Sequence, residues 1–234
     1  MKSGRAGRIG IRVFAFAMIL AAIFLVAAIP RAMAADMEDA QGIVDKARVT
    51  LSAFMRDKDY EWLRENIKKA KGVLIYPQVL KAGFILGGSG GTGVLLAKDS
   101  KTGEWSDPAF YTLGSVSYGL QIGGEAAEVV VLVMSQKGVD ALLTSKFKLG
   151  GDTSIALGPV GAGAKANITA DFISFAKSKG LYAGLNLDGS YLDVREKLNK
   201  AYYGKEATPV DIIVKKSVRN LEAVPLKEEL KKAQ

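Results

Sequence analysis

The apolar residues between positions 36 and 57 recur at three- and four-residue steps, which places them on one face of an α-helix. This stripe comprises Ala40, Ile43, Val44, Ala47, Leu51, Phe54 and Met55. Asp36 can cap the helix, and Asp39 lies in its first turn, where the helix dipole favours a negative charge. We expect the stripe to pack on a sheet, with packing on lipid as the alternative.

A second helix is predicted over residues 59–71, with Tyr60, Leu63 and Ile67 on one side. Its last turn carries three lysines: Lys68, Lys69 and Lys71. Cations are favoured at this end of a helix, because the helix dipole is negative there.

After position 72 the pattern changes to short apolar runs separated by glycine, proline or aspartate, which is typical of strands joined by turns. Strands are predicted over 73–76, 84–86, 94–96, 109–121, 129–133, 153–157, 164–169, 171–176, 181–187 and 190–194. Pro77 is expected to end the first strand, and the glycine run 87–93 to form a hairpin or a barrel corner. Further helices are predicted over 138–145, 195–203 and 225–233, with another helix start at 208–211.

These elements predict an α+β fold: an antiparallel, glycine-rich sheet curved into a barrel or sandwich, with N- and C-terminal helices packed on it. About 200 residues, from 36 to 234, suffice for a single domain with its own core. The predicted core contains Val73, Ile75, Phe84, Leu86, Leu95, Phe110, Val129, Val131, Val133, Ile155 and Leu185. Trp105 and Tyr203 are expected to pack at the ends of the sheet.

Residues 1–35 have the pattern of an export signal peptide: a basic start, an unbroken apolar run over 13–28, and small residues before a cleavage site. The run is shorter than the roughly 20 residues that span a bilayer comfortably. We therefore expect cleavage near Ala34 or Ala35 and a periplasmic protein. An uncleaved membrane anchor is the alternative.

Most of the net charge belongs to this signal. The chain has 32 basic and 24 acidic residues, a formal net charge of +8. Five of the basic residues and none of the acidic ones lie in the first 34 positions, which leaves 27 against 24, or +3. Such a mild charge does not support nucleic-acid binding.

The composition also excludes several chemistries. With no histidine and no cysteine, the chain lacks the residues of Ser-His-Asp and Cys-His catalysis, the usual zinc ligands and disulfides. A metal site made only of carboxylates stays open, but no sequence pattern points to one. Four other polar residues indicate no specific reaction: Ser106, Ser115, Glu125 and Glu128. We predict no enzymatic activity, no cofactor and no metal.

Gly88, Gly90 and Gly93 match the spacing of a dinucleotide-binding loop. That motif needs a helix directly after its last glycine, so that the helix N-terminus faces the pyrophosphate. Residues 94–97 are β-like instead. We therefore interpret the glycines as structural and predict no nucleotide binding.

The second predicted helix combines an aromatic residue with basic ones, which suits a membrane interface with anionic head groups. An ordinary amphipathic helix whose last turn complements its dipole is the alternative. The candidate lipid-binding residues are Trp62, Lys68, Lys69, Lys71 and Lys81.

A series of short segments runs through the glycine-rich region and beyond it. They are AKGVLIYP (70–77), KAGF (81–84), GG (87–88), GTGVL (91–95), WSDPAF (105–110), GLQIG (119–123), LG (149–150), GPVG (158–161), SKGLYAG (178–184) and AYYG (201–204). In this order they resemble the SYLF family, also called the Ysc84 actin-binding family. The core of the resemblance covers residues 66–204, and the chain looks like an exported bacterial member.

The resemblance implies a lipid-binding module. Eukaryotic members look like phosphoinositide binders at membranes, some of them bind actin, and many carry an SH3 or FYVE domain. Neither addition occurs within these 234 residues, and actin and phosphoinositides are not expected in a bacterial periplasm. Only the binding of anionic phospholipid is therefore carried over. We predict a non-enzymatic module that associates peripherally with anionic phospholipid membranes from the periplasm. The alternative is a protein-interaction or envelope-structural module with a protein partner.

Overall fold

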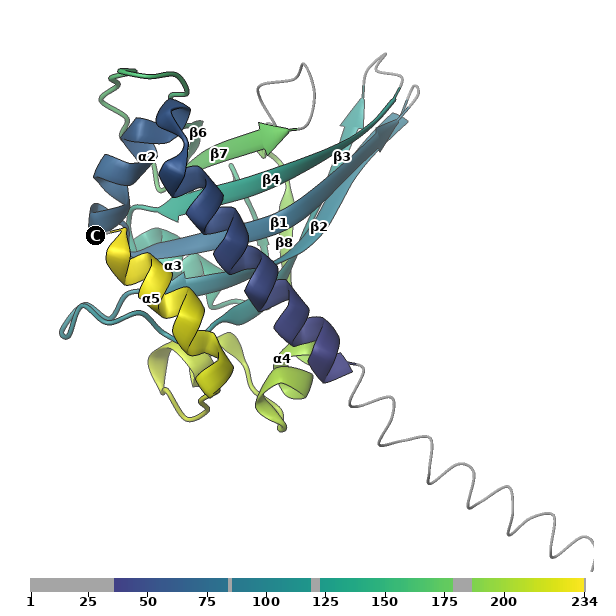
Figure 1. The fold of residues 1–234 in the computed structure, drawn as a ribbon. Coiled ribbons are helices and arrows are strands. Elements are labelled where there is room, and N and C mark those ends of the chain that lie inside the picture. The colour runs from purple at the N-terminus through teal and green to yellow at the C-terminus, as the bar shows by residue number, and fades with distance from the viewer. Residues whose placement is uncertain (1–35, 84–85, 119–122, 179–186, 234) are drawn as a thin grey trace, which may run out of the picture.

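Eight strands form one sheet that curls into a half-barrel, with helices from both ends of the chain packed on it (Figure 1). The computed structural model describes residues 36–83, 86–118, 123–178 and 187–233. The strands are β1 (Gly72–Gly83), β2 (Leu86–Ala97), β3 (Ala109–Tyr118), β4 (Gly123–Val133), β5 (Lys146–Lys148), β6 (Ile155–Leu157), β7 (Phe172–Ser178) and β8 (Tyr191–Val194). This architecture confirms the predicted α+β fold.

Most helices precede or follow the strands in sequence, and α3 lies between β4 and β5. The N-terminal helix spans 36–56. The others are η1 (Lys58–Tyr60), α2 (Glu61–Asn66), η2 (Ile67–Lys69), α3 (Gln136–Leu142), α4 (Glu196–Tyr203), the π-helical turn η3 (Val210–Val214), η4 (Leu221–Ala223) and α5 (Val224–Lys232). Among the described residues, no helix combines the length and the hydrophobicity that crossing a bilayer requires.

The strand order is β5-β8-β3-β2-β1-β4-β7-β6. Neighbouring strands are antiparallel, as predicted, except for β6 and β7, which run parallel. A parallel pair needs a crossover between its strands. Residues 158–171 supply it as an irregular segment, so the strand predicted over 164–169 is wrong.

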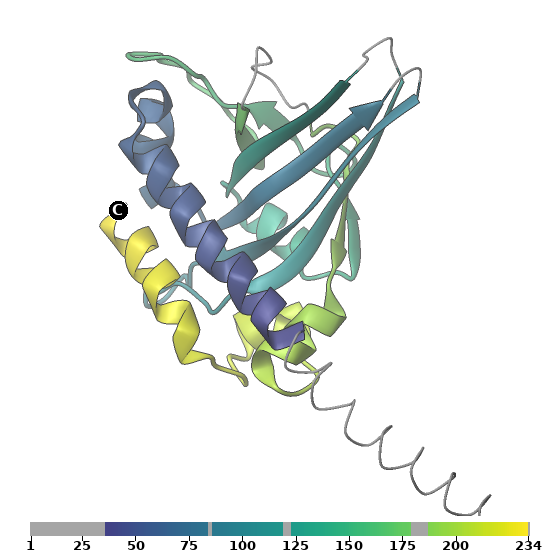
Figure 2. The same ribbon diagram turned by 45° about the vertical axis from the view of Figure 1, so that its right-hand side comes forward.

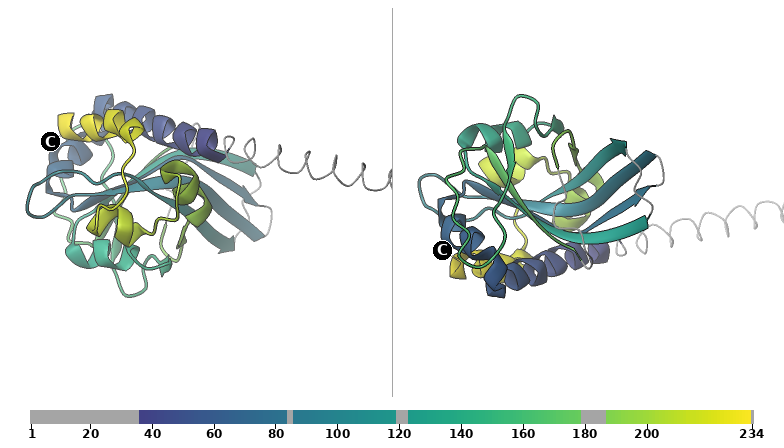
Figure 3. Two further views of the ribbon diagram at one scale, coloured as in Figure 1. Left: turned by 90° about the horizontal axis from the view of Figure 1, so that it is seen from below. Right: turned by 90° about the horizontal axis from the view of Figure 1, so that it is seen from above.

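One face of the sheet is covered by the N-terminal helix and α5, which lie side by side across it (Figures 2 and 3). The helix stripe is buried against this face, with Val44, Leu51 and Phe54 at most 1% exposed. The prediction that the stripe packs on the sheet is therefore confirmed. Leu226 and Leu230 of α5 belong to the same core.

The other face carries a second core, covered by α3 and by the chain around η3. Alternate residues of each strand point to the two faces, so β4 is buried on both, as predicted for 129–133. The buried residues that were predicted are Val73, Ile75, Leu95, Phe110, Val129, Val131 and Val133. Ile155 is only partly buried. Phe84, Leu185 and the side chain of Leu86 lie outside the described residues.

Pro77 does not end a strand, contrary to the prediction. β1 continues through it with a β-bulge, since the register shifts between Ile75 and Gln78 against β2. A bulge accommodates proline because it interrupts the hydrogen-bonded ladder.

The same bulge explains why the glycine run 87–93 is part of β2 and not a hairpin or corner. A Cβ atom at Gly91 would lie 2.3 Å from the carbonyl oxygen of Gln78, and one at Gly93 would lie 2.2 Å from that of Ile75. Real Cβ atoms do not approach so closely. The bulged backbone of β1 therefore requires glycine opposite it, and the run forms a strand.

Smaller elements also differ from the prediction. The helix expected over 59–71 is three short pieces, η1, α2 and η2, and the start at 208–211 leads only into the turn η3. β5 has no counterpart among the predicted strands. The predicted export signal over 1–35 and most of the predicted strand over 181–187 lie outside the described residues.

Candidate functional site

Four lysines gather at the end of the sheet where β1 begins and β2 ends. Lys71 immediately precedes β1, and its N–H donates to the carbonyl oxygen of Val133 at 2.7 Å. Lys98 immediately follows β2, and its N–H donates to the carbonyl oxygen of Lys71 at 2.8 Å. The short helix η2 carries Lys68 and Lys69 just before this point.

Lys98 connects the parts of this basic end. Its Nζ donates to the carbonyl oxygen of Lys68 at 2.9 Å and lies 5.0 Å from the centroid of the Trp105 ring. Trp105 is 4% exposed and pairs with Lys98 in an isolated β-bridge. The ammonium group of Lys98 thus lies over the face of the Trp105 ring, in the geometry of a cation–π contact.

Three of these lysines have no acidic partner among the described residues. Lys68, Lys69 and Lys71 are exposed and form no ion pair within the described part of the chain; Lys69 donates only to the amide oxygen of Asn66, at 2.9 Å. Burial first, and then repulsion from Lys71, lowers the pKa of Lys98. An anion beside these ammonium groups would relieve that repulsion.

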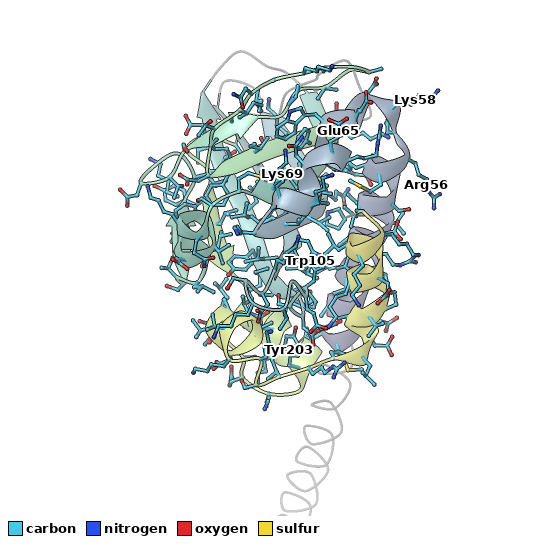
Figure 4. The ribbon with its side chains drawn as sticks, turned by 90° about the vertical axis from the view of Figure 1, so that its left-hand side faces the viewer. Arg56, Lys58, Glu65, Lys69, Trp105 and Tyr203 are labelled. Carbon is cyan, nitrogen blue, oxygen red and sulfur yellow. The ribbon has the colours of Figure 1, made fainter. Side chains whose placement is uncertain are left out.

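Figure 4 shows this end facing the viewer, with Lys69 and Trp105 on one side of the molecule. Arg56, the last residue of the N-terminal helix, and Lys58 of η1 are exposed and project at the right-hand edge of the same view. Two acids lie close in sequence: Asp99 directly follows Lys98 but is paired with Lys216, and Glu65 precedes Lys69 by one helical turn and forms no ion pair among the described residues. The surface is therefore predominantly basic.

Three of the five predicted lipid-binding residues come together here, namely Lys68, Lys69 and Lys71. Lys81 does not join them, because it lies ten residues further along β1, roughly 30 Å away at about 3.3 Å per residue. Lys81 is partly buried.

Trp62 is directed into the protein. It is 9% exposed, its indole N–H donates to the carbonyl oxygen of Ala166 at 3.0 Å, and its ring packs 5.9 Å from that of Phe175. As placed, it offers no aromatic surface to a bilayer. Within α2, Trp62 shares its buried face with Leu63 and Asn66, at the spacing of one side of a regular helix.

Lys98 and Trp105 were missed as site residues. Each is separated in sequence from the cluster at 68–71, and only the pairing of β1 with β2 brings them to it. The available signal was a lysine two residues after the strand predicted over 94–96. It carries little weight without the strand register.

The described residues contain no group of three or more histidine, cysteine, aspartate or glutamate residues that could hold a metal ion. What the basic end can do chemically is to bind anions through ammonium groups.

Comparison with known proteins identifies one family whose model matches the sequence of this α+β chain. Residues 114–233 match the model described as Ysc84, Las17-binding protein actin regulator. The chain therefore belongs to the Ysc84 (SYLF) family, as its sequence segments predict. The names in this family are those of binding proteins, not enzymes.

Several curated relatives support this membership. The SH3 domain-containing YSC84-like protein 1 of Bos taurus is 32% identical over 169 residues, covering 70% of this chain and 49% of the relative. Protein YSC84 of Saccharomyces cerevisiae is 35% identical over 151 residues, covering 61% and 31%. An SH3 domain-containing protein of Schizosaccharomyces pombe is 36% identical over 149 residues, covering 61% and 34%.

The chain thus spans about half the length of the animal relative and about a third of the fungal ones. No solved structure matches it.

Proposed function

We propose that this chain is a non-catalytic module that attaches peripherally to membranes containing anionic phospholipid, from the periplasmic side once its export signal is removed. The observation that carries the proposal is the basic end of the sheet. There Lys68, Lys69 and Lys71 are exposed without ion pairs in the described residues, and Lys98 lies beside them.

The chemistry of an anionic bilayer suits this arrangement. Head-group phosphates would approach the four ammonium groups and neutralise their mutual repulsion, and the supporting Trp105 would stay buried. Each basic residue near a charged bilayer contributes about 1 kcal/mol. Three exposed lysines therefore give about 3 kcal/mol, a weak and reversible attachment.

The test is co-sedimentation with phosphatidylglycerol vesicles of the chain from residue 36 on, which contains both cores and lacks the apolar run 13–28. Lys68→Glu with Lys69→Glu should weaken binding by about 30-fold or more, since at least two lysine contributions are lost. The matched control is Lys146→Glu with Lys148→Glu, two exposed lysines on β5. Equal weakening by both double variants would show that the effect follows net charge and would reject this site.

A second candidate function is that of a protein-interaction module. It is favoured by the family description, which names a Las17-binding protein. This function predicts a defined protein partner whose binding does not depend on lipid. Binding that survives the Lys68→Glu, Lys69→Glu change and the removal of vesicles would favour it over the membrane proposal.

A further inference from the structure

The two edges of the sheet differ in the residues they present. An edge strand exposes unpaired backbone N–H and C=O groups, which can pair with another strand unless the edge is protected. The edge strands here are β5 and β6. Figure 1 shows β6 beside β7, whereas β5 lies beyond β8 at the other end of the strand order.

β5 is a protected edge. The N–H of Val194 donates to the carbonyl oxygen of Ser145 at 3.0 Å, and that of Leu149 to Ser190 at 2.9 Å. Because hydrogen bonding alternates along an antiparallel strand, Lys146 and Lys148 direct their backbone groups outward. Both lysines are exposed, and a charged edge of this kind disfavours pairing with a copy of itself.

β6 carries no such charge. The N–H of Phe172 donates to the carbonyl oxygen of Ser154 at 3.0 Å, and that of Gly158 to Ser174 at 2.8 Å. Residues 154, 156 and 158 therefore face β7, while Ile155 and Leu157 direct their backbone groups away from it. In the part of the chain that the structure describes, the outward backbone groups of Ile155 and Leu157 form no backbone hydrogen bond.

The side chains near this edge are apolar and partly unprotected. Leu157 is 53% exposed and Val160 is 49% exposed. No charged residue occurs from position 153 to 164. Two copies of this edge could therefore approach each other without bringing like charges together.

We propose that two copies of this chain associate through β6, antiparallel, about a twofold axis at Ala156. This register pairs Ile155 of each copy with Leu157 of the other, so that both outward-facing residues exchange hydrogen bonds. The two side chains lie on the same face of the strand, so an aliphatic pair forms on each side of the axis. The edge is thus complementary to itself, as a twofold contact requires.

The contact is short, so we expect a dimer that forms and dissociates with protein concentration. This contact involves none of the lysines at the basic end, so dimer formation and lipid binding can be tested independently.

The first test is sedimentation equilibrium of the chain from residue 36 on, over a wide concentration range. Leu157→Pro removes only an outward-facing N–H and spares the ladder to β7. It should raise the dimer dissociation constant by about tenfold or more, because two hydrogen bonds and two aliphatic contacts are lost. Lys148→Pro is the matched control, since it removes an outward-facing N–H from β5, and it should leave the constant unchanged. Thermal unfolding of both variants establishes that they fold.

The second test uses the absence of cysteine from the chain. Residues facing each other in a non-hydrogen-bonded antiparallel pair have Cα atoms about 4.5 Å apart, within the range of a disulfide. Ala156→Cys should therefore form a disulfide-linked dimer on mild oxidation much faster than Lys148→Cys. A chain that stays monomeric throughout, a dimer unaffected by Leu157→Pro, or equal crosslinking of the two cysteine variants would overturn the proposal.

Discussion

Gly93 shows how a single residue decides the path of a strand in this protein. Its missing side chain admits both the carbonyl of Ile75 and the ring of Tyr76, which a Cβ atom would approach to 2.2 and 2.6 Å. The close backbone approach is possible only where the neighbouring strand has no side chain at all. The β-bulge at Pro77 and the glycine opposite it therefore depend on each other.

We predict that Gly93→Ala destabilises the fold by about 1–3 kcal/mol, the usual cost of forcing atoms into a packed interior. Gly114→Ala is the control, because a Cβ at that position meets nothing within 4 Å. Urea unfolding compares the two. Similar losses of unfolding free energy from both substitutions would mean that the close approach of the backbone is not the reason why position 93 requires glycine.

Asp107 and Lys227 form the most buried ion pair among the described residues. Their side chains are 6% and 19% exposed, with Nζ and Oδ1 2.5 Å apart. Asp107 also accepts the backbone N–H of Asn220 at 3.0 Å. The pair fastens α5 to the segment between β2 and β3.

Lys227→Met should cost about 3–5 kcal/mol of unfolding free energy, since it leaves the Asp107 carboxylate buried without its counter-charge. Lys231→Met, in the same helix, breaks an exposed pair with Glu228 and should cost at most about 1 kcal/mol. Chemical denaturation of the two variants measures the difference. Comparable costs would show that Asp107 is neutralised by other means.

At the scale of elements, Asp171 ties the start of β7 to α3 and to the chain before β6. Its carboxylate accepts hydrogen bonds from the Ser135 hydroxyl, which also caps α3, and from the N–H of Ser154 at 2.9 Å. The Ser135 bond first, and then the Ser154 N–H, lower the pKa of Asp171.

A carboxyl group whose pKa is lowered by folding stabilises the folded state above its unfolded pKa of about 3.9. This stabilisation is lost as the pH falls from about 5 through the folded pKa. We expect Asp171→Asn to lower stability at pH 7 and to reduce its loss between pH 5 and 3. Unfolding free energies measured across that range test this, and an unchanged slope would contradict it.

Elements with strong local patterns could be predicted from the sequence, and those that depend on a partner strand could not. The N-terminal helix has an unbroken stripe, and α4 ends at Gly204, which adopts a positive φ of 70°. By contrast, β1 runs through Pro77 only because of a bulge, and the glycine run of β2 is a strand only because that bulge faces it. Trp62 is buried by contacts with Ala166 and Phe175, which lie more than a hundred residues further along the chain.

For the molecule as a whole, charge is distributed unevenly although the net charge beyond residue 35 is small. The basic end combines residues from η2 and from the chain ends beside β1 and β2. The acids that accompany many other lysines are already paired, as in the ion pairs of Lys177 with Asp57 and of Lys216 with Asp99. An anionic surface would therefore be attracted to this end of the protein.

Vesicle binding of the chain from residue 36 on is the decisive test of our proposal that this end attaches the protein to anionic bilayers. Binding to phosphatidylcholine vesicles should be negligible, should rise with the fraction of phosphatidylglycerol, and should weaken steeply with added salt, because the contact is electrostatic. Equal binding to neutral and anionic vesicles, or no binding to either at low salt, would rule out an electrostatic attachment through this end.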